Sequence, residues 1–473
     1  THVKRSIGRR ISLPLGPVEY SPEEISSRFL HVVRNSAREY LGDAVEETVI
    51  TVPAHFDDRQ RAATVEAGLL AGFRRVSLLN EPTAAALPYA ARTRNHERIV
   101  VFDFGGGTLD VSCLEREGDD YVVHAGLGDG ELGGNDIDQV VYELFSERTA
   151  VQTDFNVAED PLIAQVLLQA AEHAKIELSD RQETTVTLPF LKRDPGDPHI
   201  SFAFTRDEMD AAVEPLIARA RALTKQAIHD AGFDRRGFDT LVLSGGSSRL
   251  PVVQQFLRAD YDVNPAARVN PEEVVAGGAA LYAASGDVAG LHVREALSHT
   301  LAIELSDGSC VPVIRKNQSL PASRTRIFTT VADQQIEAEI HLLQGDKRDA
   351  ADNRSLGRFT LTNIETGAQG RARITVSVSV DEDGLVTLRA GDRTTGVQRQ
   401  MTTRPRSESV RNAIEGDVSR YLDSLRRRIS QLAGQTRGDL KTEMEQIVEL
   451  LEEQRNAVGD DMVTVLETLI MEV

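Results

Sequence analysis

The chain has 473 residues, of which 41% are hydrophobic and 27% are charged, and this length is too great for a single hydrophobic core. We therefore expect two or three domains. The net charge of −20 argues against a nucleic-acid partner, and the lack of an eighteen-residue apolar run or signal-peptide pattern argues against a membrane partner. The two cysteines, Cys113 and Cys310, form no disulfide framework, so we expect a reducing, cytoplasmic location.

Residues 1–286 alternate between helical and strand patterns, which predicts an α/β domain. The first long helix is expected to begin at a capping box of Ser21 and Glu24, because apolar residues follow at helical spacing. A strand over TVITVPAHF and a helix ending at Gly72 come next. A second set of helices and strands runs from Ile137 to about Ala284.

Two glycine-rich turns, each directly after an apolar strand, are the most informative feature of this domain. The first strand (99–102) leads to Asp103, three glycines and Thr108. Such a turn can bring backbone amides close to a phosphate, and the Asp can hold a hydrated Mg²⁺. One such turn is more often only a turn, but a second one in LVLSGGSSRLP (241–251) could grip a nucleotide from the other side. The absence of GxxxxGK[ST] excludes a P-loop protein.

The remaining chain changes its pattern twice. Residues 296–402 alternate apolar and polar positions around the hairpin turn DEDG (381–384), which predicts a β-sandwich, and residues 287–295 would link it to the first domain. Beyond residue 402, apolar residues recur at threes and fours over 414–432, which predicts helices.

Several segments, in this order and spacing, resemble the seventy-kilodalton heat-shock chaperones of the bacterial DnaK type. This resemblance implies two actin-like ATPase lobes (1–286), a linker (287–295), a β-sandwich peptide-binding domain (296–402) and a short helical lid (403–473). The tail could instead be a helical bundle or a dimerising segment. The start THVKRSIGRR resembles an internal family segment, so we expect a fragment that lacks an N-terminal phosphate-loop hairpin. The matching segments are NEPTAAALPYA (80–90), DFGGGTLDVS (103–112), GDGELGGNDID (128–138), EHAKIELS (172–179), LVLSGGSSRLP (241–251) and the sandwich segment 320–359.

The resemblance implies an ATPase that uses ATP and Mg²⁺, with Lys4, Glu81, Thr108 and Asp110 as catalytic residues. Lys4 would orient the attacking water and stabilise the γ-phosphoryl charge, and Glu81 would also position water. Asp103 and Asp110 would lie near the metal. Residue type alone makes Lys4 an ordinary surface charge, and it leaves Asp110 as a turn residue that hydrogen-bonds its own backbone.

The resemblance also implies an adenosine site between a helix and the second glycine turn. Glu172, Lys175 and Ser179 would lie on one face of that helix, although an exposed polar stripe with an ion pair explains the same spacing. Arg249 would lie along the adenine or merely cover the surface. The implied nucleotide-binding residues are Gly105, Gly106, Gly107, Thr108, Glu172, Lys175, Ser179, Gly245, Gly246, Ser247 and Arg249.

Two residues, Pro53 and Arg61, match the family's switch between its domains, although a proline at a strand end is usually only a terminator. The resemblance implies a J-domain cochaperone and a nucleotide exchange factor as partners. Ser77 stands where DnaK-type chaperones use an arginine to contact the J-domain, so that contact would differ here.

The second domain would bind extended apolar segments of unfolded client proteins in a groove. Ser306 and Ala338 replace larger apolar residues of the family, which should widen the pocket. At about 0.8 kcal/mol per buried CH₂, this would either weaken binding of a Leu-centred peptide several-fold or move the preference to bulkier side chains. Gln369 replaces an arginine, which leaves Asp333 without the family's latch ion pair. The implied groove residues are Ile303, Ser306, Phe328, Val331, Ala338 and Ile340, of which Phe328 and Ile340 could be plain core.

The sequence is thus interpreted as an ATP-dependent chaperone in protein folding and the heat-shock stress response, in which ATP binding opens the groove and hydrolysis closes it. Two alternatives stay open. One is a client-specific chaperone, for instance in iron–sulfur assembly, and the other is a nucleotide-independent peptide-binding protein. A sugar kinase or filament protein of the same superfold would have no use for residues 296–402.

Overall fold

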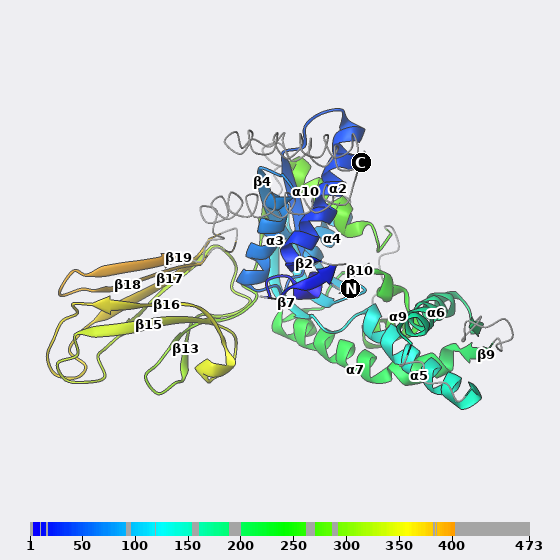
Figure 1. Cartoon of the computed structure of the whole chain (residues 1–473). Helices are drawn as coiled ribbons and strands as arrows, with labels where there is room; N and C mark the ends of the chain where they lie inside the picture. Colours follow the sequence, from blue (N-terminus) through cyan, green and yellow to red (C-terminus); the bar gives the residue numbers. More distant parts are fainter. Residues whose placement is uncertain are drawn as a thin grey trace, which may run out of the picture.

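A computed structural model describes residues 3–402, except residues 10, 16–17, 91–95, 119, 154–159, 189–199, 262–269, 286–291, 382–383 and 385. The predicted lid (403–473) and residues 287–291 of the predicted linker lie outside the described residues. The described chain forms two domains that lie side by side in Figure 1.

A five-stranded sheet in the order β10-β5-β6-β7-β11 forms the centre of the first domain. Strand β5 is its buried middle: the side chains of Val100 and Phe102 pack into one core and those of Ile99 and Val101 into another. Such a strand needs apolar residues on both faces, which explains its uninterrupted apolar run. The strands are β5 (His96–Phe104), β6 (Leu109–Glu117), β7 (Asp120–Asp129), β10 (Thr240–Ser244) and β11 (His292–Arg294).

Helices cover both faces of this sheet (Figure 1). The larger core joins one face to α5, α6, α7 and α9, and the smaller core joins the other face to α4 and the short strands β3 and β4. These mixed sheets and helices are compatible with the expected actin-like lobes. The helices are α4 (Glu81–Ala90), α5 (Gly134–Thr153), α6 (Pro161–Asp180), α7 (Arg206–Asp230), α8 (Phe233–Arg236), α9 (Pro251–Asp260), α10 (Val274–Ser285) and the 3₁₀ helix η2 (Gly246–Arg249).

The N-terminal elements carry the predicted helix signals. Helix α2 (Pro22–Leu41) begins with the predicted capping box, because Ser21 and Glu24 each accept a hydrogen bond from the other's backbone N–H. Its apolar stripe is exposed in the described part of the chain, with Phe29 at 70% and Val32 at 62%. The other elements are α1 (Val3–Ser6), α3 (Asp58–Leu70), the antiparallel pair β1 (Leu13–Leu15) and β2 (Val18–Tyr20), the parallel pair β3 (Glu47–Val52) and β4 (Arg75–Asn80), and the antiparallel pair β8 (Glu183–Leu188) and β9 (Ile200–Thr205).

Two four-stranded antiparallel sheets form the second domain and share one apolar core. The alternation predicted along 374–380 is confirmed in β17, where every second side chain is buried. The sheet β13-β12-β15-β16 contains β12 (Leu301–Glu304), β13 (Cys310–Ile314), β15 (Glu337–Gln344) and β16 (Arg354–Thr362), with the 3₁₀ helix η3 (Ala350–Asp352). The sheet β14-β17-β18-β19 contains β14 (Ala322–Phe328), β17 (Ile374–Val380), β18 (Val386–Asp392) and β19 (Gln398–Thr402).

Candidate functional site

The two glycine turns lie beside each other because the strands before them are parallel neighbours. Strands β5 and β10 pair with Asp103 opposite Ser244, so both turns begin at the same sheet edge. The hydroxyl of Ser247 donates to the carbonyl of Gly105 across a distance of 2.9 Å. Gly245 has a φ of 79°, and a Cβ there would lie 2.3 Å from the carbonyl oxygen of Phe104. This close backbone approach requires glycine.

Two carboxylates face each other at the start of the first turn. Asp103 and Asp110 are opposed on β5 and β6, and both are buried. Burial and the neighbouring carboxylates of Glu81 and Asp110 raise the pKa of Asp103 to about 7. The Oδ2 atom of Asp110 is buried without a hydrogen-bond partner among the described residues. A cation would satisfy both groups.

These residues fit a hydrated Mg²⁺ rather than a site closed by protein ligands. Among the described residues, no three His, Cys, Asp or Glu side chains are arranged to hold a metal ion. Mg²⁺ usually keeps several waters and takes only one or two carboxylates together with phosphate oxygens. Asp103 and Asp110 would supply that carboxylate part, and the metal would neutralise phosphate charge.

The ion pair of Lys4 and Glu81 lies close to these carboxylates. Lys4 in α1 pairs with Glu81, the first residue of α4, with 2.7 Å between Nζ and Oε1. Burial would lower the pKa of Lys4, but the charge of Glu81 raises it, so the amine stays protonated. Its neighbour Arg5 donates to the carbonyl of Gly107 (2.9 Å from Nε) and pairs with Asp136 (2.6 Å), which holds the glycine turn.

The helix predicted to contact adenosine is α6. Lys175 forms a buried ion pair with Asp138 (2.7 Å) and donates to the carbonyl of Gly134 (3.2 Å), so it does not pair with Glu172. The Ser179 hydroxyl donates within the helix to the carbonyl of Lys175. Glu172 is exposed. Of these residues, Lys175 is thus placed beside Gly134, where it is already paired with Asp138.

Arg249 at the end of η2 also has partners. It donates to the side chain of Asn270 (2.7 Å) and pairs with Glu272 (3.5 Å), and half of its side chain is exposed. Thr108 closes the first glycine turn, because its carbonyl accepts from the N–H of Gly105 (3.1 Å).

The two predicted switch residues lie near contacts with the end of the predicted linker and with the second domain. Pro53 is buried directly after β3. Arg61 in α3 donates to the side chain of Asn80 (2.6 Å), which donates in turn to Glu295, the last residue of the predicted linker (2.6 Å). Two elements of the first domain, α3 and β4, and the end of the predicted linker thus share one polar network.

Direct contacts also join the domains. The hydroxyl of Ser298 donates to the carbonyl of Ala54 (2.6 Å), and Arg354 of β16 forms an ion pair with Asp57. Strand β11, within the predicted linker, pairs in parallel with β7. The linker end therefore extends the sheet of the first domain.

The residues predicted for the peptide groove divide into three groups by burial. Ile303 and Ile340 are buried in the core of the second domain, whereas Phe328 and Ala338 pack only partly against it. Val331 is 56% exposed, and Ser306 is exposed as well. Sequence reasoning did not place Ile327 (50% exposed) and Ile336 (64% exposed) in the groove. Asp333 accepts from the backbone N–H of Gln369 (2.8 Å), in place of the family's ion pair.

Sequence reasoning also missed three polar residues near the first glycine turn and its carboxylates. His55 contacts Asp110 with 2.9 Å between Nδ1 and Oδ1, Arg5 holds the first glycine turn, and Asp138 pairs with Lys175. The charge of Asp110 and its hydrogen bond raise the pKa of His55, although burial alone would lower it. The one available signal was the position of His55 just after a strand end.

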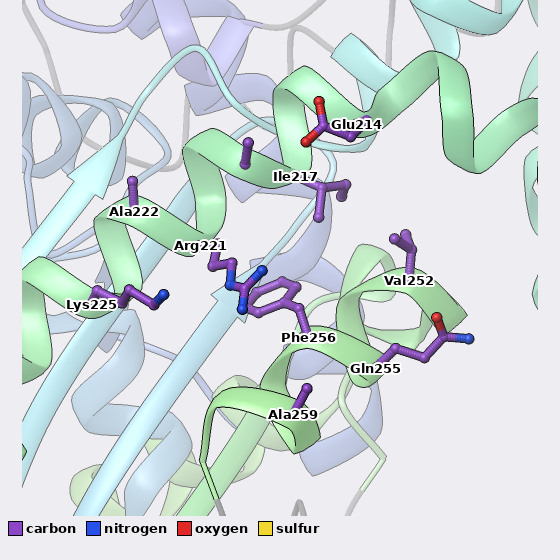
Figure 2. Close-up of a pocket in the computed structure, with 10 residues that line it drawn as sticks. Glu214, Ile217, Arg221, Ala222, Lys225, Val252, Gln255, Phe256 and Ala259 are labelled. Carbon is purple, nitrogen blue, oxygen red and sulfur yellow. The ribbon is translucent and has the colours of Figure 1, made fainter.

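A separate pocket of about 650 Å³ lies between α7 and α9 (Figure 2). Figure 2 shows that α7 contributes Arg221 and α9 contributes Phe256 to its lining, and Arg221 pairs with Asp260. None of the predicted site residues lines this pocket. Its lining consists of Glu214, Ile217, Ala218, Arg221, Ala222, Lys225, Val252, Gln255, Phe256 and Ala259.

Two further findings concern the chain as a whole. No helix in the described ranges is long and apolar enough to cross a membrane. A family model described as Hsp70 protein matches residues 6–471, which is nearly the full sequence.

Proposed function

Because the chain belongs to the Hsp70 protein family, whose members are in general Mg²⁺-dependent ATPases and chaperones, we propose that it is an ATP-driven chaperone. It binds and hydrolyses ATP in the first domain and binds extended apolar segments of unfolded proteins in the second. The observation that carries this proposal is the convergence of two glycine turns, two buried carboxylates and the Lys4–Glu81 pair at one edge of the five-stranded sheet.

Each of these groups has a role in phosphoryl transfer. Backbone amides of the glycine turns bind phosphate oxygens, and Asp103 and Asp110 hold a hydrated Mg²⁺. Lys4 stabilises the charge that develops on the transferred phosphoryl group, and Glu81 positions Lys4 and the attacking water. Catalysis of this kind relies on positioning and charge neutralisation, with no covalent intermediate on the protein.

The proposed peptide site lies where β14 ends and β15 begins. Ile327, Val331 and Ile336 expose apolar side chains there, and Phe328 and Ala338 form a partly buried floor. Exposed apolar side chains gathered beside strand backbone suit an extended peptide, which binds through main-chain hydrogen bonds and a few side-chain pockets.

ATP would control this site through the contacts between the domains. A ligand shifts an equilibrium only when it binds one state better than the other. In our proposal MgATP favours the state in which Asp57, Asn80 and the loop after β3 hold the second domain, and hydrolysis releases that hold and closes the groove. Arg61 and Pro53 act as the switch.

The finer parts of the proposal follow the resemblance to the DnaK type. They are a cytoplasmic location, a place in the stress response, and partnership with a J-domain cochaperone and a nucleotide exchange factor. Ser77 lies in β4 beside the network of Asn80 and Glu295, so a J-domain would contact this chain without the family's arginine.

Release of a bound peptide by nucleotide tests the proposal. A fluorescent peptide of seven residues with a central leucine is bound to the protein, and its dissociation is followed after mixing with MgATP or MgADP. We expect MgATP to speed release at least tenfold over MgADP. Equal release with both nucleotides would contradict the proposal and favour a nucleotide-independent peptide-binding protein.

The small side chains at two groove positions favour a second candidate, a client-specific chaperone. Ser306 is exposed at the end of β12, and Ala338 contributes only a methyl group to the floor. A wider pocket suits a bulkier or particular client side chain. A peptide array tests this: binding limited to one motif would support the specialised chaperone, and binding to many unrelated apolar peptides would exclude it.

A further inference from the structure

His55 lies between the loop after β3 and the carboxylate of Asp110. Its Nδ1 lies 2.9 Å from Oδ1 of Asp110, and its backbone N–H points to the same oxygen at 3.4 Å. The other oxygen, Oδ2, has no hydrogen-bond partner among the described residues. The protein therefore hydrogen-bonds one oxygen of Asp110, and the other oxygen stays available to a ligand.

The ring of His55 occupies a place that the surrounding backbone leaves open for it. A Cβ on Gly128 would lie 2.3 Å from Nδ1 of His55 and 2.5 Å from Oδ1 of Asp110. A Cβ on Gly130 would lie 3.2 Å from Nε2 of the same ring. The ring also meets Phe56 edge to face, with 5.8 Å between the ring centroids. The hydrogen bond to Asp110 thus depends on glycine in the facing strand.

The direction of this hydrogen bond follows from the chemistry of the two groups. An ionised carboxylate only accepts hydrogen bonds, so Nδ1 of His55 must carry the proton that it donates. A carboxylate held at one oxygen cannot rotate freely, and the remaining oxygen keeps one direction. Groups that hold a metal-binding carboxylate in this way typically contribute 10–100-fold to metal affinity or activity.

The second domain holds the backbone that carries His55. Nε2 of His299 lies 2.9 Å from the carbonyl oxygen of His55, next to the hydrogen bond from Ser298 to Ala54. Burial lowers the pKa of His299, so its ring is neutral and donates through Nε2. The side chain of His55 therefore contacts Asp110, while its carbonyl oxygen contacts the second domain.

We propose that His55 is a positioning residue for Asp110 and, through it, for the Mg²⁺ that accompanies ATP. This role rests on the proposed ATPase function and extends it. His55 would act through the carboxylate of Asp110, to which it is hydrogen-bonded. Its backbone carbonyl contacts His299 of the second domain, so one residue connects that domain to Asp110.

Two substitutions separate the hydrogen bond from the packing of the ring. His55→Phe fills the same space without a donor, and His55→Asn places an amide N–H near the position of Nδ1. For both variants and the wild type, ATP turnover is measured against ATP and against free Mg²⁺. The melting temperature shows whether the fold is intact. Nucleotide binding without Mg²⁺ shows whether the other nucleotide contacts are intact.

We expect His55→Phe to lower kcat by 10–100-fold and to raise the Mg²⁺ concentration for half-maximal turnover, while Mg²⁺-free nucleotide affinity stays unchanged. His55→Asn should recover most of the loss. Normal turnover and Mg²⁺ dependence in His55→Phe would overturn the role, as would equal losses in both variants, because restoring the donor would then have no effect. A wild-type chain without any ATP turnover would overturn the proposed function itself.

Discussion

Lys4 and Glu81 lie 77 positions apart in sequence, yet their side chains form an ion pair with 2.7 Å between Nζ and Oε1. The pair joins the first helix of the described chain to the start of α4, beside the carboxylates of Asp103 and Asp110. The positive charge of Lys4 acts on those carboxylates as well as on Glu81. Among the described residues, Lys4 is the lysine whose charge acts on this acidic group, and its expected role in hydrolysis follows from that position.

Lys4→Ala should therefore abolish most ATP turnover while nucleotide still binds. The change removes the charge that stabilises the transferred phosphoryl group, and losing such a group typically costs 10²–10³ in kcat. Steady-state turnover and binding of a fluorescent ATP analogue measure the two effects separately. Arg75→Ala is the control, because it removes an exposed ion pair to Glu47 and should leave turnover within twofold. Normal turnover in Lys4→Ala would refute its role.

Association of the two domains should weaken as the pH rises through about 6. Burial raises the pKa of Asp58 from 3.8 to about 6, against the opposing effects of Arg61 and a hydrogen bond with Gln344 of the second domain. An acid with a raised pKa favours the associated, protonated state below its ordinary pKa and loses that contribution as pH rises through the raised value, at about 1.4 kcal/mol per pH unit.

The contribution is lost between the ordinary pKa of 3.8 and the raised value of about 6, so energy transfer between dyes on the two domains is followed from pH 4 to 7. The wild type should lose transfer as the pH rises. Asp58→Asn cannot ionise and keeps polar contact with Gln344, so its signal should stay nearly flat. The same slope in both proteins would show that another group controls the association.

Peptide affinity should respond to Ala338 and to the exposed side chains near it. Ala338→Val adds two carbon atoms to the floor of the proposed groove, which at about 0.8 kcal/mol per buried CH₂ should strengthen binding of a Leu-centred peptide several-fold. Ile336→Ser should weaken it. Leu162→Ser on α6 is the control, because Leu162 is 60% exposed, close to the 64% of Ile336. Fluorescence anisotropy gives the affinities, and equal values in all variants would place the peptide elsewhere.

Stimulation of the ATPase by peptide should depend on His299. His299→Phe removes the donor to the carbonyl of His55, whereas His299→Gln supplies an amide N–H near the position of Nε2. We expect the Phe variant to keep basal turnover but to lose most of its stimulation, and the Gln variant to keep both. Full stimulation in the Phe variant would mean that the contact carries no coupling.

The local features of the fold could be predicted from the sequence because short-range rules determine them. The capping box of Ser21 starts α2, and the alternation over 374–380 gives a strand with one buried face. The strand patterns before both glycine turns also correspond to β5 and β10. Their parallel pairing was not predicted, although it is what brings the turns together.

Features that depend on tertiary packing could not be predicted in this way. The contact of His55 with Asp110 spans 55 positions and needs Gly128 in a facing strand. Burial was equally hidden: Ile340 is in the core and Phe29 is exposed, although both fit an apolar pattern. Periodicity identifies an apolar face but not what covers it.

The measurement that tests the central claim most directly is ATP turnover in Mg²⁺ with and without an extended apolar peptide. The account predicts slow basal hydrolysis that rises several-fold with peptide and disappears in Lys4→Ala. Absence of Mg²⁺-dependent hydrolysis, or hydrolysis indifferent to a peptide that demonstrably binds, would contradict it.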